Sequence, residues 1–124
     1  MKNFRFLIPL ILFTQMAAGQ YSTPGTGVNW DLADIVSNAS GVLTFDGTKY
    51  LLWSNLTISQ NDTLSVITDE VLRINAGVEI NVLGTFYSGP PGLFQISAMD
   101  TAAHFKGLNF NNSDGSVIEK CEIE

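Results

Sequence analysis

An eight-residue repeat of short apolar triplets is the feature that most restricts how this chain can fold. Each triplet has a polar residue between two apolar ones, and four recur in sequence: Leu56-Thr57-Ile58, Leu64-Ser65-Val66, Leu72-Arg73-Ile74 and Ile80-Asn81-Val82. On a pleated strand this order places two side chains on one face and the middle side chain on the other. Each triplet therefore predicts a very short, half-buried strand.

The repeat fits either an antiparallel meander or a solenoid, and its spacing favours the solenoid. A meander of such short strands has too small a face to be stable without a second sheet. If three strands instead form the sides of one turn, the turn contains roughly 24 residues, which is within the range of structural repeats. The corners are polar or small, as bends require: Gln60-Asn61-Asp62, Thr68-Asp69-Glu70 and Asn75-Ala76-Gly77.

Residues 29–41 carry the helical pattern. Asp31 is suited to the N-cap, and Asp34 follows three residues later, near the positive end of the helix dipole. Apolar residues then recur at spacings of three and four, which predicts a helix from Asp31 to Ser40 with one buried face. Gly41 stands where a left-handed C-terminal residue is expected. The apolar residues of this face are Leu32, Ile35, Val36 and Ala39.

The segments on either side of this helix are less regular. Residues 20–28, QYSTPGTGV, predict a flexible, exposed leader. After Gly41 the pattern changes to strand, and Asp46-Gly47 between two apolar runs indicates either a hairpin turn or a corner of the coil. Ser88 to Gly92, SGPPG, predicts a tight turn rather than a projecting loop.

Residues 1–19 have the three zones of a secretory signal peptide. Lys2 and Arg5 form a positive start, residues 6–13 an apolar middle, and Ala17-Ala18-Gly19 a small-residue cleavage site. The apolar run is far shorter than the roughly 20 residues that span a bilayer. The pattern predicts cleavage before Gln20, a secreted or cell-surface location, and no membrane insertion after cleavage.

Charge and cysteine content narrow the classes of partner. Of the six Lys and Arg residues two lie in residues 1–19, so four remain against twelve Asp and Glu, a formal charge of −8. Such a chain is unsuited to binding nucleic acid, which requires a basic face.

Cys121 is the single cysteine, so an internal disulfide is impossible. No general base that would activate its thiol can be identified, so Cys121 is predicted to be a small buried apolar group.

Two longer stretches, NDTL followed by VLRINAGVEINVLGTF, and FKGLNFNNSDGSVIEKCEIE, resemble the N-terminal coils of secreted bacterial right-handed parallel β-helix proteins of the pectate-lyase-like superfamily. The resemblance covers about Leu56 to Glu124. Phe105 stands where that family often has Trp, and Asn75-Ala76-Gly77 lacks its usual Pro. The resemblance implies an all-β, right-handed parallel β-helix in which residues 29–41 cap the N-terminal end. Residues 42–124 would be its first coils, incomplete at the C-terminus.

The residues that suggest chemistry form no recognisable catalytic set, and no catalytic, cofactor-binding or metal-binding residue is predicted. His104 lacks the partners of a triad or metal site. Arg73 could approach Asp69 and Glu70, most simply as a surface ion pair. The acidic corner residues are dispersed, whereas calcium requires six or more converging oxygens. These residues are Asp62, Asp69, Glu70 and Glu79.

Asparagine is frequent near the C-terminus and in potential glycosylation sequons. The polar row there indicates either sugar contacts or ordinary turns and asparagine ladders; it comprises Asn109, Asn111, Asn112, Ser113 and Asp114. The sequons are interpreted as chance occurrences, because the family that the chain resembles is bacterial. They begin at Asn38, Asn55, Asn61 and Asn111.

The sequence therefore favours a secreted or cell-surface scaffold that is non-catalytic in this segment and contacts polysaccharide or a cell-surface glycan. A third possibility, an adhesin or stalk, differs from this scaffold only in the partner that it contacts. The alternative is the N-terminal part of a polysaccharide lyase or glycoside hydrolase whose catalytic residues lie beyond Glu124. An uncapped last coil further predicts end-to-end self-association of Gln20 to Glu124, since free strand edges accept new strands.

Overall fold

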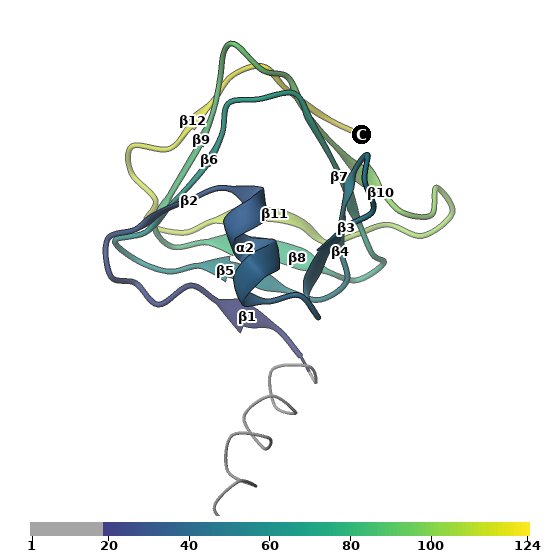
Figure 1. The fold of residues 1–124 in the computed structure, drawn as a ribbon, viewed down its shortest axis with the longest axis horizontal. Coiled ribbons are helices and arrows are strands. Elements are labelled where there is room, and N and C mark those ends of the chain that lie inside the picture. The colour runs from purple at the N-terminus through teal and green to yellow at the C-terminus, as the bar shows by residue number, and fades with distance from the viewer. Residues whose placement is uncertain (1–18) are drawn as a thin grey trace, which may run out of the picture.

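The three sides of each turn are short parallel strands that stack into three sheets. The computed structural model describes residues 19–124, which form a parallel β-solenoid of about three turns with one short helix (Figure 1). Viewed from the helix end, the chain passes through successive sides clockwise and away from the viewer, which makes the coil right-handed. The all-β solenoid that the triplets predicted is confirmed.

Each sheet takes one strand from every turn. Sheet A consists of β1 (Tyr21–Ser22), β5 (Leu56–Ile58), β8 (Glu79–Val82) and β11 (Gly107–Phe110). Sheet B consists of β2 (Asn29–Trp30), β6 (Thr63–Val66), β9 (Thr85–Ser88) and β12 (Val117–Ile118). Sheet C consists of β3 (Leu43–Phe45), β4 (Tyr50–Leu52), β7 (Glu70–Ile74), β10 (Phe94–Ala98) and β13 (Cys121–Ile123).

The strand register confirms the predicted length of the first full turn. Leu56 of β5 pairs with Ile80 of β8, 24 residues later, in a parallel ladder. The next turn is longer, since Glu79 pairs with Gly107, 28 residues later. The corner between β10 and β11, residues 99–106, has eight residues, against four in the corner between β7 and β8, residues 75–78. The solenoid thus keeps its cross-section by lengthening corners and leaving its strands unchanged.

The outer residues of the predicted triplets fill the interior of the solenoid. Leu56, Ile58, Leu72 and Ile74 are almost completely buried, whereas Thr57 and Arg73 between them are only partly so. Larger side chains complete the core, and the rings of Phe86 and Phe94 lie 6.2 Å apart across the second turn. Apolar burial of this kind contributes roughly 25 cal/mol per Å² and is the main source of stability in a chain without disulfides.

The predicted helix covers the N-terminal end of the stack. Helix α2 (Leu32–Asn38) begins at Asp31, whose carboxylate accepts the N–H of Asp34 while Asp34 accepts the N–H of Asp31, forming a capping box. Its residues Leu32 and Ile35 are buried. The helix lies across the first turn (Figure 1). The expectation for Gly41 is wrong: the chain leaves the helix at Ala39 (φ −147°), and Gly41 has no positive φ.

The segment predicted to be a flexible leader, residues 20–28, is instead part of the coil. Residues 21–22 form β1 and pair with β5, and β2 (residues 29–30), which pairs with β6, begins directly after the segment. Thr23 is buried and its hydroxyl accepts the N–H of Ser59 at 2.8 Å. The segment lacks periodicity because its one strand has only two residues.

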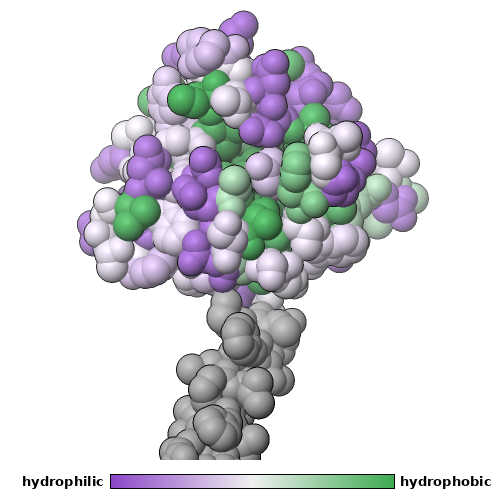
Figure 2. Space-filling view, in the orientation of Figure 1, coloured by the Kyte–Doolittle hydropathy of each residue, from purple (hydrophilic) through white to green (hydrophobic). Residues whose placement is uncertain are grey.

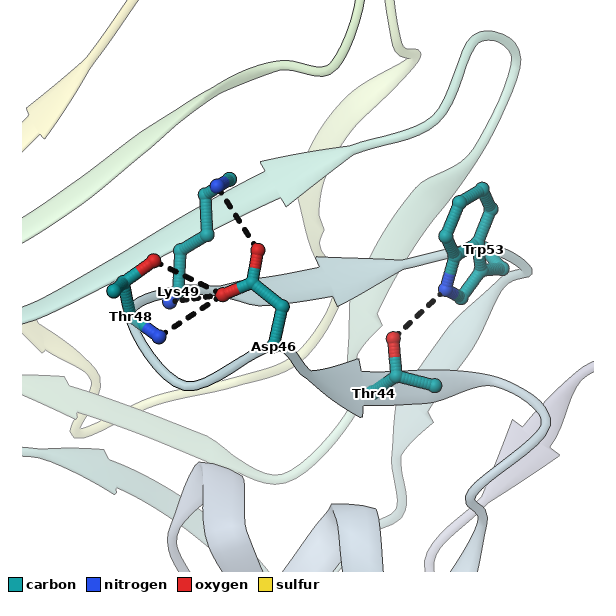
Figure 3. Close-up of polar contacts among 5 residues, drawn as sticks. All are labelled: Thr44, Asp46, Thr48, Lys49 and Trp53. Atoms are coloured by element: carbon teal, nitrogen blue, oxygen red, sulfur yellow. Dashed lines mark hydrogen bonds and ion pairs between the residues drawn. The ribbon is translucent and has the colours of Figure 1, made fainter.

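The Asp46-Gly47 turn is a hairpin turn and not a corner of the coil, because the strands it joins, β3 and β4, belong to the same sheet. β3 and β4 form an antiparallel hairpin, while the other edge of β4 pairs in parallel with β7. The Asp46 carboxylate closes the turn by accepting the N–H groups of Thr48 and Lys49, and it also pairs with the Lys49 ammonium at 2.9 Å (Figure 3). These contacts lower the pKa of Asp46 well below its usual range.

Two sequence predictions concern other parts of the chain. Residues 89–92 form the predicted tight turn, in which a Cβ on Gly92 would lie 2.1 Å from the backbone of Thr68. The predicted signal peptide lies almost wholly outside the described residues. Within residues 19–124, no helix has the length and apolar character needed to cross a membrane.

Candidate functional site

A groove on the outward face of sheet C gathers polar side chains from three successive turns. It has a volume of about 120 Å³, and its floor is formed by β7, β10 and β13. Strands in a sheet lie about 4.8 Å apart, so each turn supplies side chains at that interval along the solenoid axis. The residues that line the groove are Val71, Arg73, Gln95, Ile96, Ser97, Glu122 and Glu124.

Arg73 is the only cation in this groove. It lies on β7 between Leu51 of β4 and Ser97 of β10, with which it is in register. Its Nε is buried and makes no hydrogen bond within the described part of the chain. A buried donor without a partner carries a desolvation cost that a bound acceptor would relieve. Trp30 Nε1, in the core, is the other buried donor without a partner in residues 19–124, so the Nε of Arg73 is the one such donor that lies in the groove.

The expected approach of Arg73 to Asp69 and Glu70 is not observed. The Asp69 carboxylate accepts the N–H of Leu93 at 2.8 Å, and the Glu70 carboxylate accepts the Thr68 hydroxyl at 2.7 Å. The ion pair that the structure shows in residues 19–124 joins Lys49 and Asp46, and Arg73 belongs to none. The acidic residues occupy the corner and the first position of β7, whereas Arg73 faces outward from the middle of the strand.

Two other polar side chains of the groove, Gln95 and Glu122, bond to each other across neighbouring turns. Gln95 donates from Nε2 to the Glu122 carboxylate at 3.2 Å, a contact between residues on adjacent strands. This leaves the Gln95 carbonyl oxygen, the Ser97 hydroxyl and most of both glutamate carboxylates free to bond a ligand. The groove thus offers donors and acceptors in a row, fixed on strands rather than on loops.

Trp53 adds an exposed aromatic ring to the same face. It follows β4 and is 44% exposed, and its indole N–H donates to the Thr44 hydroxyl at 2.9 Å (Figure 3). Trp53 does not line the groove: its indole bonds Thr44 of β3, on the side of β4 away from Arg73, and the residue lines a separate hollow with Ser54 and Asn55. The hydrogen bond fixes the ring plane, so its exposed face is available to an apolar surface.

The asparagine row predicted near the C-terminus is divided between a strand and a loop. Asn109 lies on β11 and donates to the Glu79 carboxylate at 2.7 Å and to the Asn81 oxygen at 3.3 Å. This ladder satisfies the Asn109 amide within sheet A, as one of the two sequence interpretations anticipated. The other four residues follow β11 in an exposed or half-buried loop; they are Asn111, Asn112, Ser113 and Asp114.

Asp62 holds a position that the sequence did not reveal. Its side chain is 1% exposed and accepts the N–H of Gly25 at 2.8 Å and those of Gly27 and Val28 at 2.9 Å. Burial alone would raise the pKa of Asp62, but these hydrogen bonds, with one from Thr23, outweigh it and lower the pKa to about 2. The carboxylate therefore fastens the link between β1 and β2 to the corner before β6.

His104 and Cys121 are not brought together. His104 is an exposed residue of the segment between β10 and β11, and its carbonyl accepts the N–H of Gly77. Cys121 is half-buried on β13, in register with Phe94, and burial raises the pKa of its thiol. A raised pKa reduces the thiolate population that a nucleophile needs. Across residues 19–124, no group of three His, Cys, Asp or Glu side chains is placed to hold a metal ion.

Comparisons of this chain with protein-family models, curated proteins and solved structures found no match. The solenoid fold therefore stands on the strand register, and the similarity to the pectate-lyase-like superfamily stays a resemblance of short sequence phrases. Any function must be argued from the groove on sheet C and the residues that line it.

Proposed function

We propose that this chain is a secreted or cell-surface scaffold, non-catalytic in this segment, that contacts polysaccharide through the outward face of sheet C. The observation that carries the proposal is the Nε of Arg73, which is buried without a hydrogen-bond partner in a groove with Gln95 and Ser97. The location rests on the signal-peptide pattern of residues 1–19.

The chemistry of the groove suits a polyhydroxylated ligand. A sugar hydroxyl both donates and accepts, and the groove offers guanidinium donors, carboxylate acceptors and the hydroxyl of Ser97. A long ligand that continues from the groove across β4 would meet the exposed ring of Trp53, which offers an apolar surface to the less polar face of a sugar ring. Binding sites of this kind combine an aromatic surface with a few positioned polar groups.

The geometry of the solenoid favours a linear ligand. The side chains of Arg73 and Ser97 occupy equivalent positions on consecutive turns, so they form a row along the solenoid axis. A polysaccharide lying along that axis would meet similar positions at intervals of about 4.8 Å. A small compact molecule would contact only one or two of them.

The test is affinity electrophoresis of the secreted chain through gels that each contain one neutral or acidic polysaccharide. We expect retardation in at least one gel, and Arg73→Met should weaken it about tenfold, because it keeps the aliphatic stem and removes the charged donors. Lys106→Met is the matched control, since Lys106 is exposed and lies outside the groove. Equal retardation of both variants, with unchanged melting temperatures, would contradict the proposal.

A further inference from the structure

A small hollow, here called the cap hollow, lies where the helix meets the corner between sheets B and C. It has a volume of about 70 Å³ and is enclosed by the first turn of α2 and by residues of β4, β6 and β7 (Figure 1). On the face of the molecule that carries α2, hydrophilic residues separate small hydrophobic patches (Figure 2). The cap hollow has the same mixed character, with a polar lining that includes Asp31, Tyr50 and Glu70 and an apolar lining of Leu32, Ala33 and Val66.

Two carboxylates line the cap hollow, and each keeps one oxygen free. Asp31 accepts the N–H of Asp34 through Oδ1 at 2.8 Å, and Glu70 accepts the Thr68 hydroxyl through Oε2 at 2.7 Å. In the part of the chain that the structure describes, the second oxygen of each carboxylate makes no hydrogen bond. None of the residues that line the cap hollow is basic. Its two negative charges are therefore not neutralised by its own lining.

The hydroxyl of Tyr50 is a third group that is free to bond a ligand. The Tyr50 side chain is only 7% exposed, and its hydroxyl makes no hydrogen bond with any other residue in 19–124. Burial, and then the charges of Glu70 and Asp31, raise the pKa of Tyr50. Both carboxylates are therefore near the hydroxyl without being bonded to it. A polar group with little access to water gains when a bound ligand supplies its partner.

We propose that the cap hollow binds a primary alkylammonium group, the group carried by lysine side chains and by polyamines. An ammonium has three N–H donors, and the cap hollow presents three acceptors, on Asp31, Tyr50 and Glu70. Hydrogen bonds between an ammonium and a carboxylate are among the strong ones in proteins. The methylene stem of the ligand would lie against Ala33 and Val66, as the stems of lysine side chains do on apolar surfaces. This proposal is independent of carbohydrate binding on sheet C.

Size and charge distinguish an alkylammonium from other occupants. The cap hollow holds about the volume of two water molecules, roughly 30 Å³ each in the liquid, which suits an ammonium on a narrow stem better than a sugar ring. Calcium prefers six or more oxygens, and the cap hollow has two carboxylates. The start of α2 carries about half a positive charge, which the carboxylates of Asp31 and Asp34 outweigh.

The test is a titration of the full secreted chain, isotope-labelled, with Nα-acetyl-lysine amide at physiological salt, followed by the NMR shifts of backbone amides. The amides of Leu32, Ala33 and Glu70 should shift together, with a millimolar dissociation constant. Diaminopentane should shift the same amides, and the tighter of the two ligands identifies the source of the ammonium. The same lysine derivative acetylated at Nε is uncharged and should cause no shift. Equal binding of this neutral compound, or of glucosamine, would contradict the proposal.

Substitutions connect the binding to the cap hollow. Asp31→Asn and Glu70→Gln should each weaken it about tenfold, since each replaces a carboxylate by a neutral amide. Asn is also a good N-cap, so Asp31→Asn keeps α2 in place. Tyr50→Phe should weaken binding about threefold through the loss of one neutral acceptor.

Asp69→Asn is the matched control, because Asp69 precedes Glu70 in the chain but does not line the cap hollow. It should leave the affinity for the lysine derivative unchanged. The proposal is overturned if Asp69→Asn weakens binding as much as Glu70→Gln does, if Tyr50→Phe has no effect, or if the shifts are spread over the whole acidic surface.

Discussion

Replacing Asp62 by Asn should destabilise the fold more than its small chemical change suggests. The carboxylate receives three backbone N–H groups, and Asn can offer only one acceptor oxygen in the same space. Its amide group would then face either the N–H of Gly25 or those of Gly27 and Val28, donor against donor. A pKa lowered from 3.8 to about 2 in a 1% exposed group corresponds to about 2 kcal/mol at neutral pH. We expect Asp62→Asn to cost at least that amount.

The pH dependence of this loss identifies its cause. The folded-state pKa of Asp62 is lower than the unfolded value, so its contribution is complete above about pH 4 and disappears as the pH falls toward 2. Urea unfolding followed by the fluorescence of buried Trp30 measures the difference between wild type and Asp62→Asn. That difference should shrink steadily between pH 4 and pH 2.

Asp69→Asn is the matched control for Asp62→Asn, because Asp69 is exposed and its side chain accepts a single N–H, from Leu93. It should cost less than about 1 kcal/mol at any pH. The reasoning is refuted if Asp62→Asn costs no more than this control, or if its cost is the same at pH 2.5 and pH 7.

Three further substitutions test the packing of the coil and its cap. Gly84→Ala should destabilise by more than about 2 kcal/mol in urea unfolding, because its Cβ would lie 2.2 Å from the carbonyl oxygen of Asp62. Ile35→Ala should cost about 2–4 kcal/mol and lower the melting temperature, since Ile35 is fully buried on the inner side of the cap helix. Asp31→Ala should cost about 1 kcal/mol by the same assay through loss of the capping box.

Local patterns were sufficient to predict the architecture. The triplets specify two inward residues and one outward residue, and the polar corners separate them, so a coil of short strands follows from the spacing. Three sides per turn were chosen because the resulting turn length is within the range of structural repeats. The start of α2 was equally accessible, because Asp31 and Asp34 act on backbone groups within three residues. In both cases the interacting groups are close in sequence, and the sequence itself displays their spacing.

Contacts between residues on different turns could not be predicted from local sequence patterns. Asp62 bonds Gly25, Gly27 and Val28, which lie 34–37 residues earlier, and no local pattern links them. The expectation for Gly41 failed because the chain turns into β3 through Ala39 without a left-handed residue.

Arg73 illustrates how the fold assigns neighbours to an outward residue. Its sequence neighbours Asp69 and Glu70 are held elsewhere, while Leu51 and Ser97, 22 and 24 residues away, stand beside it. Leu72 and Ile74 fill the core and cannot change without a cavity, but Arg73 between them contributes nothing to that interior. The outward row can therefore vary one turn at a time while the solenoid persists. Specificity for a linear ligand would then reside in the order of outward residues along the axis.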